Sequence, residues 1–389
     1  MVALRPIISV GCVLSAMSIT ALAPYVSASD AAIATSEGNE FARPRARDIG
    51  IAPGILTPGP LNAITDVAGV LVGHVTLSDG QTINTGATAI LPHGGNLYRD
   101  RVPAGFYQGN GYGKFAGSTQ VIELGELETP IILTNTLSVP QGMEAAISWT
   151  LKQSGNEDVR SVNAVVGETN DGYLNDIRGR HLRADTIETA ITSAKTGAVE
   201  EGSVGAGRGT ISFGWKGGIG TSSRVLPSTL GSYTIGVLAQ TNYGGILRVD
   251  GVPVGRLLDQ YFMKETLDKG DADGSVIVVI ATNAPLSDRN LERLASRAML
   301  GIGRTGSPVT NGSGDYILAF STTESVRRGA NRSPSNGLDN SQLSPLFQAV
   351  VEATEEAILN ALFKATSVSG HRGSVDAINI DAMTRILAR

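Results

Sequence analysis

The 389 residues carry a net charge of −5 without long runs of one sign, so the sequence points neither to nucleic acid nor to a membrane surface as a partner. Hydrophobic residues make up 41% of the chain and glycines number 48, which is typical of a globular protein with a large core and many tight turns. The single cysteine, Cys12, excludes a disulfide within the chain and a thiolate-rich metal site.

Residues 1–28 are predicted to be an export signal. Arg5 gives a positive start, residues 7–23 are mostly apolar, and the Val-Ser-Ala of residues 26–28 is a small-x-small cleavage site. Cys12 lies inside this segment, so the mature chain would have no cysteine and thiol catalysis is excluded. We expect a periplasmic or secreted protein without membrane attachment after signal removal.

Residues 29–58 contain Ala, Ser and Pro together with three arginines, and we expect a poorly ordered lead-in there. Beyond it, short apolar runs bounded by Gly, Pro or Asn predict strands, several of them buried on both faces. The predicted strands cover residues 69–75, 87–91, 130–133, 162–166, 210–213, 234–238, 276–280 and 316–320.

Helical patterns lie between these strands. Ser287 is a plausible N-cap of one helix, with Gly301 after its end, and Ser344 with Pro345 is the expected N-cap and first residue of another. Strands and helices therefore mix throughout, which predicts an α+β fold with layers of sheet between layers of helix. The predicted helices cover residues 143–152, about 254–264, 288–300 and 345–362.

Two polar segments, residues 264–273 and 327–341, are predicted linkers. The first ends at Gly274-Ser275, directly before a predicted buried strand. A cut between Gly274 and Ser275 would give Ser275 both a hydroxyl nucleophile and a free α-amine. Such an amine has a reference pKa near 8, so it can take the hydroxyl proton near neutral pH. Taken alone, a Gly-Ser pair before a strand is more often an ordinary loop.

Three further polar residues are candidates for the same chemistry. Ser313 and Asp315 alternate with glycine at the start of a predicted strand, so both can point to one side and reach the Ser275 hydroxyl or its α-amine. Asn-Gly and Ser-Gly in this stretch also suit a plain turn. Asn242 follows a predicted strand, where its amide could donate to a developing oxyanion or cap a turn.

Other kinds of site find little support in the sequence. The four histidines, His74, His93, His181 and His371, lie at no metal-binding spacing, and neither HExxH nor a G-x-S-x-G elbow occurs. The glycine-rich residues 205–209 precede a strand and lack a complete phosphate-binding pattern, which favours a structural role. We therefore expect no metal or other cofactor.

Five stretches taken together resemble one family. They are GPLNAITDVAGV at 59–70, VGETNDG at 166–172, KGGIGTSSR at 216–224, DGS at 273–275 and NGSG at 311–314. They follow one another within residues 50–385, nearly the whole mature chain. The chain thus resembles the peptidase family of the L-aminopeptidase/D-esterase DmpA and the β-peptidyl aminopeptidases.

This resemblance implies a precursor that cuts itself before Ser275, giving chains of residues 29–274 and 275–389 of one catalytic domain. It also implies a four-layer αββα sandwich, similar to N-terminal-nucleophile hydrolases but wired differently, and a homo-oligomer. Ser275 is then the nucleophile and Asn242 an oxyanion donor. Ser313 and Asp315 orient the nucleophile and its amine, although some similar members have Glu at the latter position. Asn170 or Tyr173 is expected to supply a second oxyanion contact or a contact to the substrate amine.

The expected function is that of an exported serine aminopeptidase with an acyl-enzyme on Ser275. Its expected substrates are short peptides, amides and esters with an N-terminal β-amino acid, D-Ala or small L-residue. One alternative is an acyltransferase similar in architecture to ornithine acetyltransferases, although those have Thr at the junction. The other alternative is an exported binding protein in which the Gly274–Ser275 bond is never cut.

Overall fold

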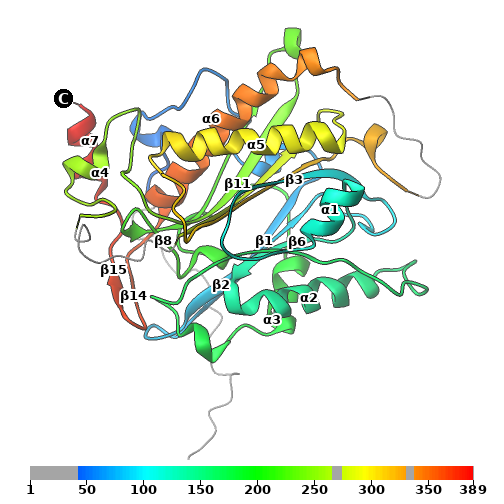
Figure 1. The fold of residues 1–389 in the computed structure, drawn as a ribbon, viewed down its shortest axis with the longest axis horizontal. Helices are drawn as coiled ribbons and strands as arrows, with labels where there is room; N and C mark the ends of the chain where they lie inside the picture. Colours follow the sequence, from blue (N-terminus) through cyan, green and yellow to red (C-terminus); the bar gives the residue numbers. More distant parts are fainter. Residues whose placement is uncertain (1–42, 265–273, 330–336, 389) are drawn as a thin grey trace, which may run out of the picture. The chain divides into compact units, whose positions relative to one another are not determined.

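The computed structural model describes residues 43–264, 274–329 and 337–388, which all lie in one compact unit (Figure 1). The predicted export signal, Cys12 and most of the predicted linker 264–273 fall outside the described residues. Within the described ranges, every helix is too short or too polar to cross a membrane.

Two sheets form the centre of the structure. In the larger sheet the strand order is β10-β11-β12-β13-β3-β5, and only β12 and β13 run parallel to each other. Its strands are β10 (Gly218–Val225), β11 (Thr234–Asn242), β12 (Ser275–Thr282), β13 (Gly314–Ser321), β3 (Val102–Gly111) and β5 (Glu126–Leu127).

The smaller sheet has the strand order β1-β2-β6-β7-β4, with β6 and β7 parallel. Its strands are β1 (Leu71–Ser78), β2 (Asn84–Leu91), β6 (Ile131–Asn135), β7 (Val165–Thr169) and β4 (Phe115–Ala116). Two hairpins complete the strands, β8 (Ile211–Ser212) with β9 (Trp215–Lys216) and β14 (Val368–Gly370) with β15 (Gly373–Val375).

Helices cover the two sheets on separate sides (Figure 1). Helices α5 and α6 contact the larger sheet, and α2 and α3 contact the smaller one. The helices are α1 (Ser118–Leu124), α2 (Val139–Leu151), α3 (Ala184–Thr192), α4 (Val254–Leu257), α5 (Asp288–Arg304), α6 (Ser344–Lys364) and α7 (Ile380–Leu387).

Strand β12 shows how the sequence pattern gives this packing. Val276, Val278 and Ile280 belong to the core that includes α5 and α6, whereas Ile277 and Val279 belong to a second core that holds residues of both sheets. A third core joins the smaller sheet to α2 and α3. Because β12 is buried on both faces, its sequence is continuously apolar after Ser275 instead of alternating. The prediction that strands and helices mix throughout is confirmed.

The prediction of a poorly ordered lead-in is wrong for residues 43–58. Arg43 donates to the carbonyl oxygens of Phe363 and Ile378, and Arg47 pairs with the Glu356 carboxylate at 2.9 Å. These arginines bind carbonyl and carboxylate groups in α6 and shortly before α7, so their charges fix the segment to the body instead of solvating a free tail.

Some predicted boundaries also differ from the structure. Helix α5 does have Ser287 as its N-cap, but it continues through Gly301 to Arg304. Ser344 lies inside α6, which is capped by Leu343, and α4 is only four residues long where about eleven were predicted. Strand β3 was not predicted, because its central Gly-Phe-Tyr-Gln-Gly stretch gives no continuous apolar run.

Candidate active site

Ser275 is the first residue of β12, beside the start of β13, and its side chain is 7% exposed. Its hydroxyl donates to the carbonyl oxygen of Gly274 at 2.7 Å. The Gly314 amide lies 3.2 Å from that same carbonyl oxygen and 3.3 Å from the Ser275 hydroxyl oxygen. One backbone N–H therefore polarises the carbonyl that a Ser275 attack on its own preceding bond would reach.

Asn242 lies directly across from Ser275, because the last pair of the antiparallel β11–β12 ladder is Asn242 with Ser275. Directly opposite residues on neighbouring strands point to the same face of a sheet. The side-chain oxygen Oδ1 of Asn242 accepts a hydrogen bond of 2.9 Å from the Ile211 amide. Its orientation is thereby fixed, with the NH₂ group left as the donor end beside Ser275.

Ser313 and Asp315 do share one side, as predicted, since the Ser313 hydroxyl donates to Asp315 Oδ1 at 2.7 Å. This side is the face opposite the Ser275 hydroxyl: Asp315 pairs in register with Val276, whose side chain belongs to the core with α5 and α6. The structure therefore brings the pair to the backbone beside Ser275 and does not bring it to the hydroxyl.

The Asp315 carboxylate has one engaged and one open oxygen. Its Oδ2 is buried and has no hydrogen-bond partner among the described residues. Burial raises the pKa of Asp315 to about 6, and hydrogen bonds from Ser313 and the Val276 amide offset part of this increase. A buried acceptor without a partner, such as Asp315 Oδ2, can be stabilised by a hydrogen bond from a cationic donor.

A cavity of about 550 Å³ contains Asn242 together with both predicted substrate-binding residues, Asn170 and Tyr173. Asn170 is exposed in the loop after β7, and its side-chain oxygen accepts from the Gly172 amide. Tyr173 is 45% exposed and follows in the same turn. Asn242 ends β11 and the other two residues lie in the turn after β7, so this cavity brings the predicted oxyanion donor to the predicted substrate-binding residues. Ser275 is not among its lining residues.

The glycine-rich residues 205–209 have the structural role that the sequence favours. A Cβ on Gly207 would lie 2.5 Å from the Ile219 amide nitrogen, so only glycine allows this approach of two backbones. The fully buried Lys216 donates to the carbonyl oxygens of Gly207 and Gly217 at 2.8 and 2.7 Å. These contacts hold the loop that carries Ile211, the residue that orients Asn242.

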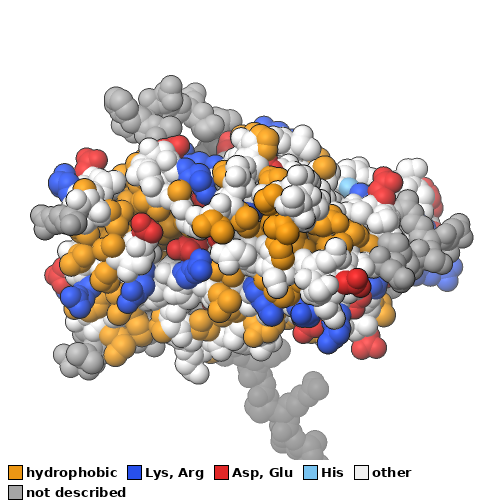
Figure 2. All heavy atoms as spheres, turned by 90° about the horizontal axis from the view of Figure 1, so that it is seen from above, with side chains coloured by type: hydrophobic (Ala, Val, Ile, Leu, Met, Phe, Trp, Pro, Cys, Tyr) orange, Lys and Arg blue, Asp and Glu red, His pale blue; other side chains and the backbone are white. Residues whose placement is uncertain are grey.

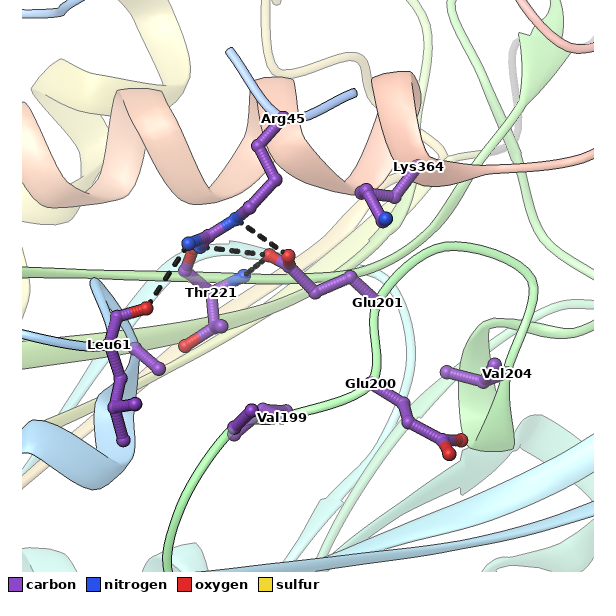
Figure 3. Close-up of a pocket in the computed structure, with 10 residues that line it drawn as sticks. Arg45, Leu61, Val199, Glu200, Glu201, Val204, Thr221 and Lys364 are labelled. Atoms are coloured by element: carbon purple, nitrogen blue, oxygen red, sulfur yellow. Dashed lines mark hydrogen bonds and ion pairs between the residues drawn. The ribbon is translucent and has the colours of Figure 1, made fainter. Parts of the chain in front are cut away.

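A second cavity, of about 420 Å³, has a different character (Figure 3). The Arg45 guanidinium pairs with Glu201 at 2.7 Å and donates to the carbonyl oxygens of Leu61 and Thr221. Burial raises the pKa of Glu201 to about 7, and the charges of Arg45 and Lys364 oppose that increase. Since Arg45 and Glu201 already bind each other and none of the predicted site residues lines this cavity, we assign these contacts to anchoring the N-terminal segment.

The histidines are separate in space as well as in sequence. His74 lies 2.9 Å from the Thr88 hydroxyl, and His181 lies 3.4 Å from the Asp176 carboxylate. Within the described ranges, no group of three His, Cys, Asp or Glu side chains could hold a metal ion.

A comparison with known proteins decides the family. The family model described as peptidase family S58 matches residues 62–376 of this chain. The chain belongs to peptidase family S58. The resemblance noted from the five sequence stretches is thereby confirmed, and the S58 chain is a serine-type aminopeptidase.

Relatives of this S58 chain include the β-peptidyl aminopeptidase BapA of Sphingosinicella microcystinivorans. It is 42% identical over 369 residues, covering 88% of this chain and 90% of the relative. The structure of a Burkholderia sp. β-aminopeptidase is 39% identical with a TM-score of 0.80, covering 88% of this chain and 98% of that one.

A third relative comes from Ochrobactrum anthropi and is described as an L-aminopeptidase D-Ala-esterase/amidase with a variant of the Ntn hydrolase fold. It is 36% identical with a TM-score of 0.81, covering 89% of this chain and 99% of that one.

Two groups that lie beside the predicted site residues were not predicted from the sequence. The first is the Gly314 N–H, which is a backbone donor, and no pattern of side chains in a sequence indicates where a backbone donor will lie. Arg372, which lines the cavity with Asn242, belongs to a short hairpin whose residues show no strand-like alternation. Contacts with the Tyr173 turn, with Ile211 and with Asn84, all distant in sequence, bring this hairpin to the cavity.

Proposed function

We propose that this S58 chain is an exported aminopeptidase that cuts itself between Gly274 and Ser275 and then uses Ser275 as its N-terminal nucleophile. Its proposed substrates are short peptides, amides and esters with an N-terminal β-amino acid, D-Ala or small L-residue. The observation that carries the proposal is the contact of the Ser275 hydroxyl with the Gly274 carbonyl, to which the Gly314 amide also donates.

In the self-cleavage, the Ser275 oxygen attacks the Gly274 carbonyl carbon and the hydroxyl proton passes to the Ser275 nitrogen, which leaves that carbon as an amine. Gly274 is then joined to the Ser275 oxygen by an ester. Water hydrolyses this ester and releases the Gly274 carboxylate and a free Ser275. The hydrogen bond from Gly314 supports the negative charge that develops on the Gly274 oxygen.

In turnover, the free α-amine of Ser275 takes the hydroxyl proton while the oxygen attacks the substrate carbonyl. The amine then gives the proton to the leaving group, and water hydrolyses the acyl-enzyme. Asn242 points to the same face as Ser275, and its side-chain oxygen Oδ1 is held by the Ile211 amide. This arrangement suits the NH₂ group of Asn242 to bind the oxyanion.

Asp315 supports the amine in this proposal. Its buried Oδ2 has no hydrogen-bond partner among the described residues of the uncut chain, and self-cleavage creates a cationic donor next to Val276. An ionised carboxylate there stabilises the ammonium that forms each time the amine takes a proton. Ser313 holds the other oxygen in place.

The proposed architecture is the αββα sandwich, wired differently from other N-terminal-nucleophile hydrolases. Three hydrophobic cores, one between the sheets and one between each sheet and its helices, support it.

We also propose a homo-oligomer. Hydrophobic side chains lie in groups between charged ones on the face in Figure 2, and Ile122 and Leu300 are 66% and 60% exposed. Light scattering of the purified protein tests this assembly, and a monomeric mass would contradict it.

Intact-mass analysis with N-terminal sequencing under denaturing conditions tests the function. We expect two chains, the smaller beginning Ser-Val-Ile, and the larger beginning near residue 29 if the signal is removed. Ser275→Ala, the matched control, should give one inactive chain because it lacks the attacking oxygen. A single wild-type chain would support the uncut binding protein, whereas two chains that transfer acetyl groups but hydrolyse no peptide would support the acyltransferase.

A further inference from the structure

The cavity beside Asn242 has a single charged side chain among its described lining residues, that of Arg372. Five of the other lining residues are aromatic, so the cavity offers apolar ring surface beside polar groups, which suits a leaving group with an apolar side chain. The lining residues are Asn170, Gly172, Tyr173, Ile177, Ile211, Phe213, Gly214, Asn242, Tyr243, Gly244, Gln260, Tyr261, Phe262 and Arg372.

The backbone at Arg372 is fixed by its contact with the Tyr173 turn. The amides of His371 and Arg372 donate to the carbonyl oxygens of Leu174 and Tyr173 at 3.0 and 2.9 Å. A Cβ on Gly370 would lie 2.1 Å from the Leu174 oxygen, so glycine is required for this close contact. The hairpin tip therefore holds Arg372 at the cavity instead of letting it move freely in solvent.

The Arg372 guanidinium is exposed and makes no hydrogen bond or ion pair with another described residue. This distinguishes it from Arg43, Arg45 and Arg47, whose donors bind carbonyl and carboxylate groups of the body. A guanidinium is always charged and offers a planar fork of donors that fits a carboxylate. Arg372 is thus the group in this cavity that can recognise an anion.

A neighbouring cavity of about 410 Å³ has the opposite charge. It shares Tyr173, Ile211, Gly214 and Gln260 with the first cavity, and its charged lining residue is Asp376. A substrate carboxylate is therefore repelled from the Asp376 side and attracted to the Arg372 side. The first cavity, at about 550 Å³, lies within the usual range of about 300–1,000 Å³ for small-ligand sites.

We propose that Arg372 binds the C-terminal carboxylate of the substrate, so that the preferred substrates are dipeptides and tripeptides with a free C-terminus and an apolar leaving residue. This inference rests on the proposed function, in which Ser275 attacks a carbonyl held near Asn242. The inference adds a residue, Arg372, by which the enzyme distinguishes peptides with a free C-terminal carboxylate from the corresponding amides and esters.

The test compares β-alanyl-L-phenylalanine with its C-terminal amide. We expect the wild-type enzyme to prefer the acid, and Arg372→Ala to lower kcat/KM for the acid about 10-fold or more, mainly through KM. The amide should be hydrolysed as before. Arg372→Lys should recover part of the loss because it keeps the charge without the fork. Added salt should raise KM for the acid alone.

Arg385→Ala is the matched control, because Arg385 is an exposed arginine of α7 that lies outside both cavities. Self-cleavage of Arg372→Ala, read by intact mass, shows that the variant folds. An equal loss for acid and amide, or no loss for either, would overturn the role of Arg372 alone. If the wild-type protein hydrolyses neither these compounds nor the corresponding D-alanyl and L-alanyl pairs, the proposed function fails and this inference fails with it.

Discussion

The side chain of Asn242 is held by the hydrogen bond that its Oδ1 atom accepts from the Ile211 amide. Replacing it with Asp keeps the shape and that acceptor but removes the NH₂ donor beside Ser275. We expect Asn242→Asp and Asn242→Ala each to lower kcat about 10²- to 10³-fold with a smaller effect on KM, as for other oxyanion donors. Steady-state kinetics measure this, and a loss confined to KM would instead assign Asn242 to substrate binding.

Asp315 gives a pH dependence with a definite sign. Burial raises its pKa from 3.8 to about 6 in the uncut chain, so the folded protein binds the proton more tightly than the unfolded one. Stability from this group is greatest below about pH 4 and is lost as the pH rises to about 6. In a Ser275→Ala background, Asp315→Asn should therefore raise the melting temperature more at about pH 7.5 than at about pH 4.

The comparison between these two uncut proteins isolates Asp315. Asp171 and Glu201, whose pKa values burial raises to about 6 and about 7, titrate in both proteins and cancel in the difference. A difference in melting temperature that does not change with pH would show that Asp315 is already protonated or already paired in the uncut chain.

At the scale of residues, the sequence was sufficient to name the candidate side chains but not to predict how the backbone arranges them. Ser275 and Asn242 were identified from a strand start and a strand end, and the β11–β12 register does make them neighbours. Ser313 and Asp315 were placed on one side correctly, but alternation alone could not show that this side faces away from the Ser275 hydroxyl. Which residues of neighbouring strands share a face depends on register, and register is a property of the folded sheet.

At the scale of elements, two of the stretches that carry the family resemblance, residues 59–70 and 216–224, contact each other in the structure. Arg224, in β10, is fully buried and pairs with Glu352 at 3.1 Å and with Glu356 at 2.7 Å, both in α6. Asn62 joins the same cluster, because its side-chain amide binds Glu356 and its oxygen accepts from Ser223. These stretches therefore hold the N-terminal segment, β10 and α6 together.

This cluster predicts a large loss of stability for a single change. Arg224→Met leaves the buried Glu352 carboxylate without its cation and leaves Glu356 paired with Arg47 alone. Removing one partner of a buried ion pair costs about 3–5 kcal/mol in the free energy of unfolding. Guanidinium unfolding in the uncut Ser275→Ala background measures it. Arg183→Met, which removes an ion pair on the surface, is the control and should change stability by about 0.5 kcal/mol or less. Equal effects of the two changes would contradict the structural role.

Elements with a plain apolar pattern were predicted closest to their true bounds. Strands β11, β12 and β13 all appear where the runs of Val, Ile and Leu lie. Strand β10, with the sequence Gly-Ile-Gly-Thr-Ser-Ser-Arg-Val, was missed because its buried positions carry hydroxyls and a charge. Such polar residues are satisfied by distant partners such as the Ala353 carbonyl oxygen and Glu352, which no local pattern contains.

At the scale of the whole molecule, the site depends on how distant parts of the chain meet. Asn170, Asn242 and Arg372 line one cavity although about 200 residues separate the first from the last. The sequence predicted the mixed layers of strand and helix because their periodicities differ. It could not predict the cavity, since the cavity exists only where β11, the turn after β7 and the β14–β15 hairpin come together.

The strand order of the larger sheet has a consequence for the enzyme after the proposed cut. Strands β12 and β13 would then belong to the smaller chain, yet they lie between β11 and β3 of the larger one. Neither chain has the complete larger sheet without the other, so the two halves cannot separate as folded bodies. Once unfolded, the halves would have to find each other by a concentration-dependent encounter instead of refolding as one chain. The cut would thus convert a reversible fold into one whose lifetime is set by its rate of unfolding.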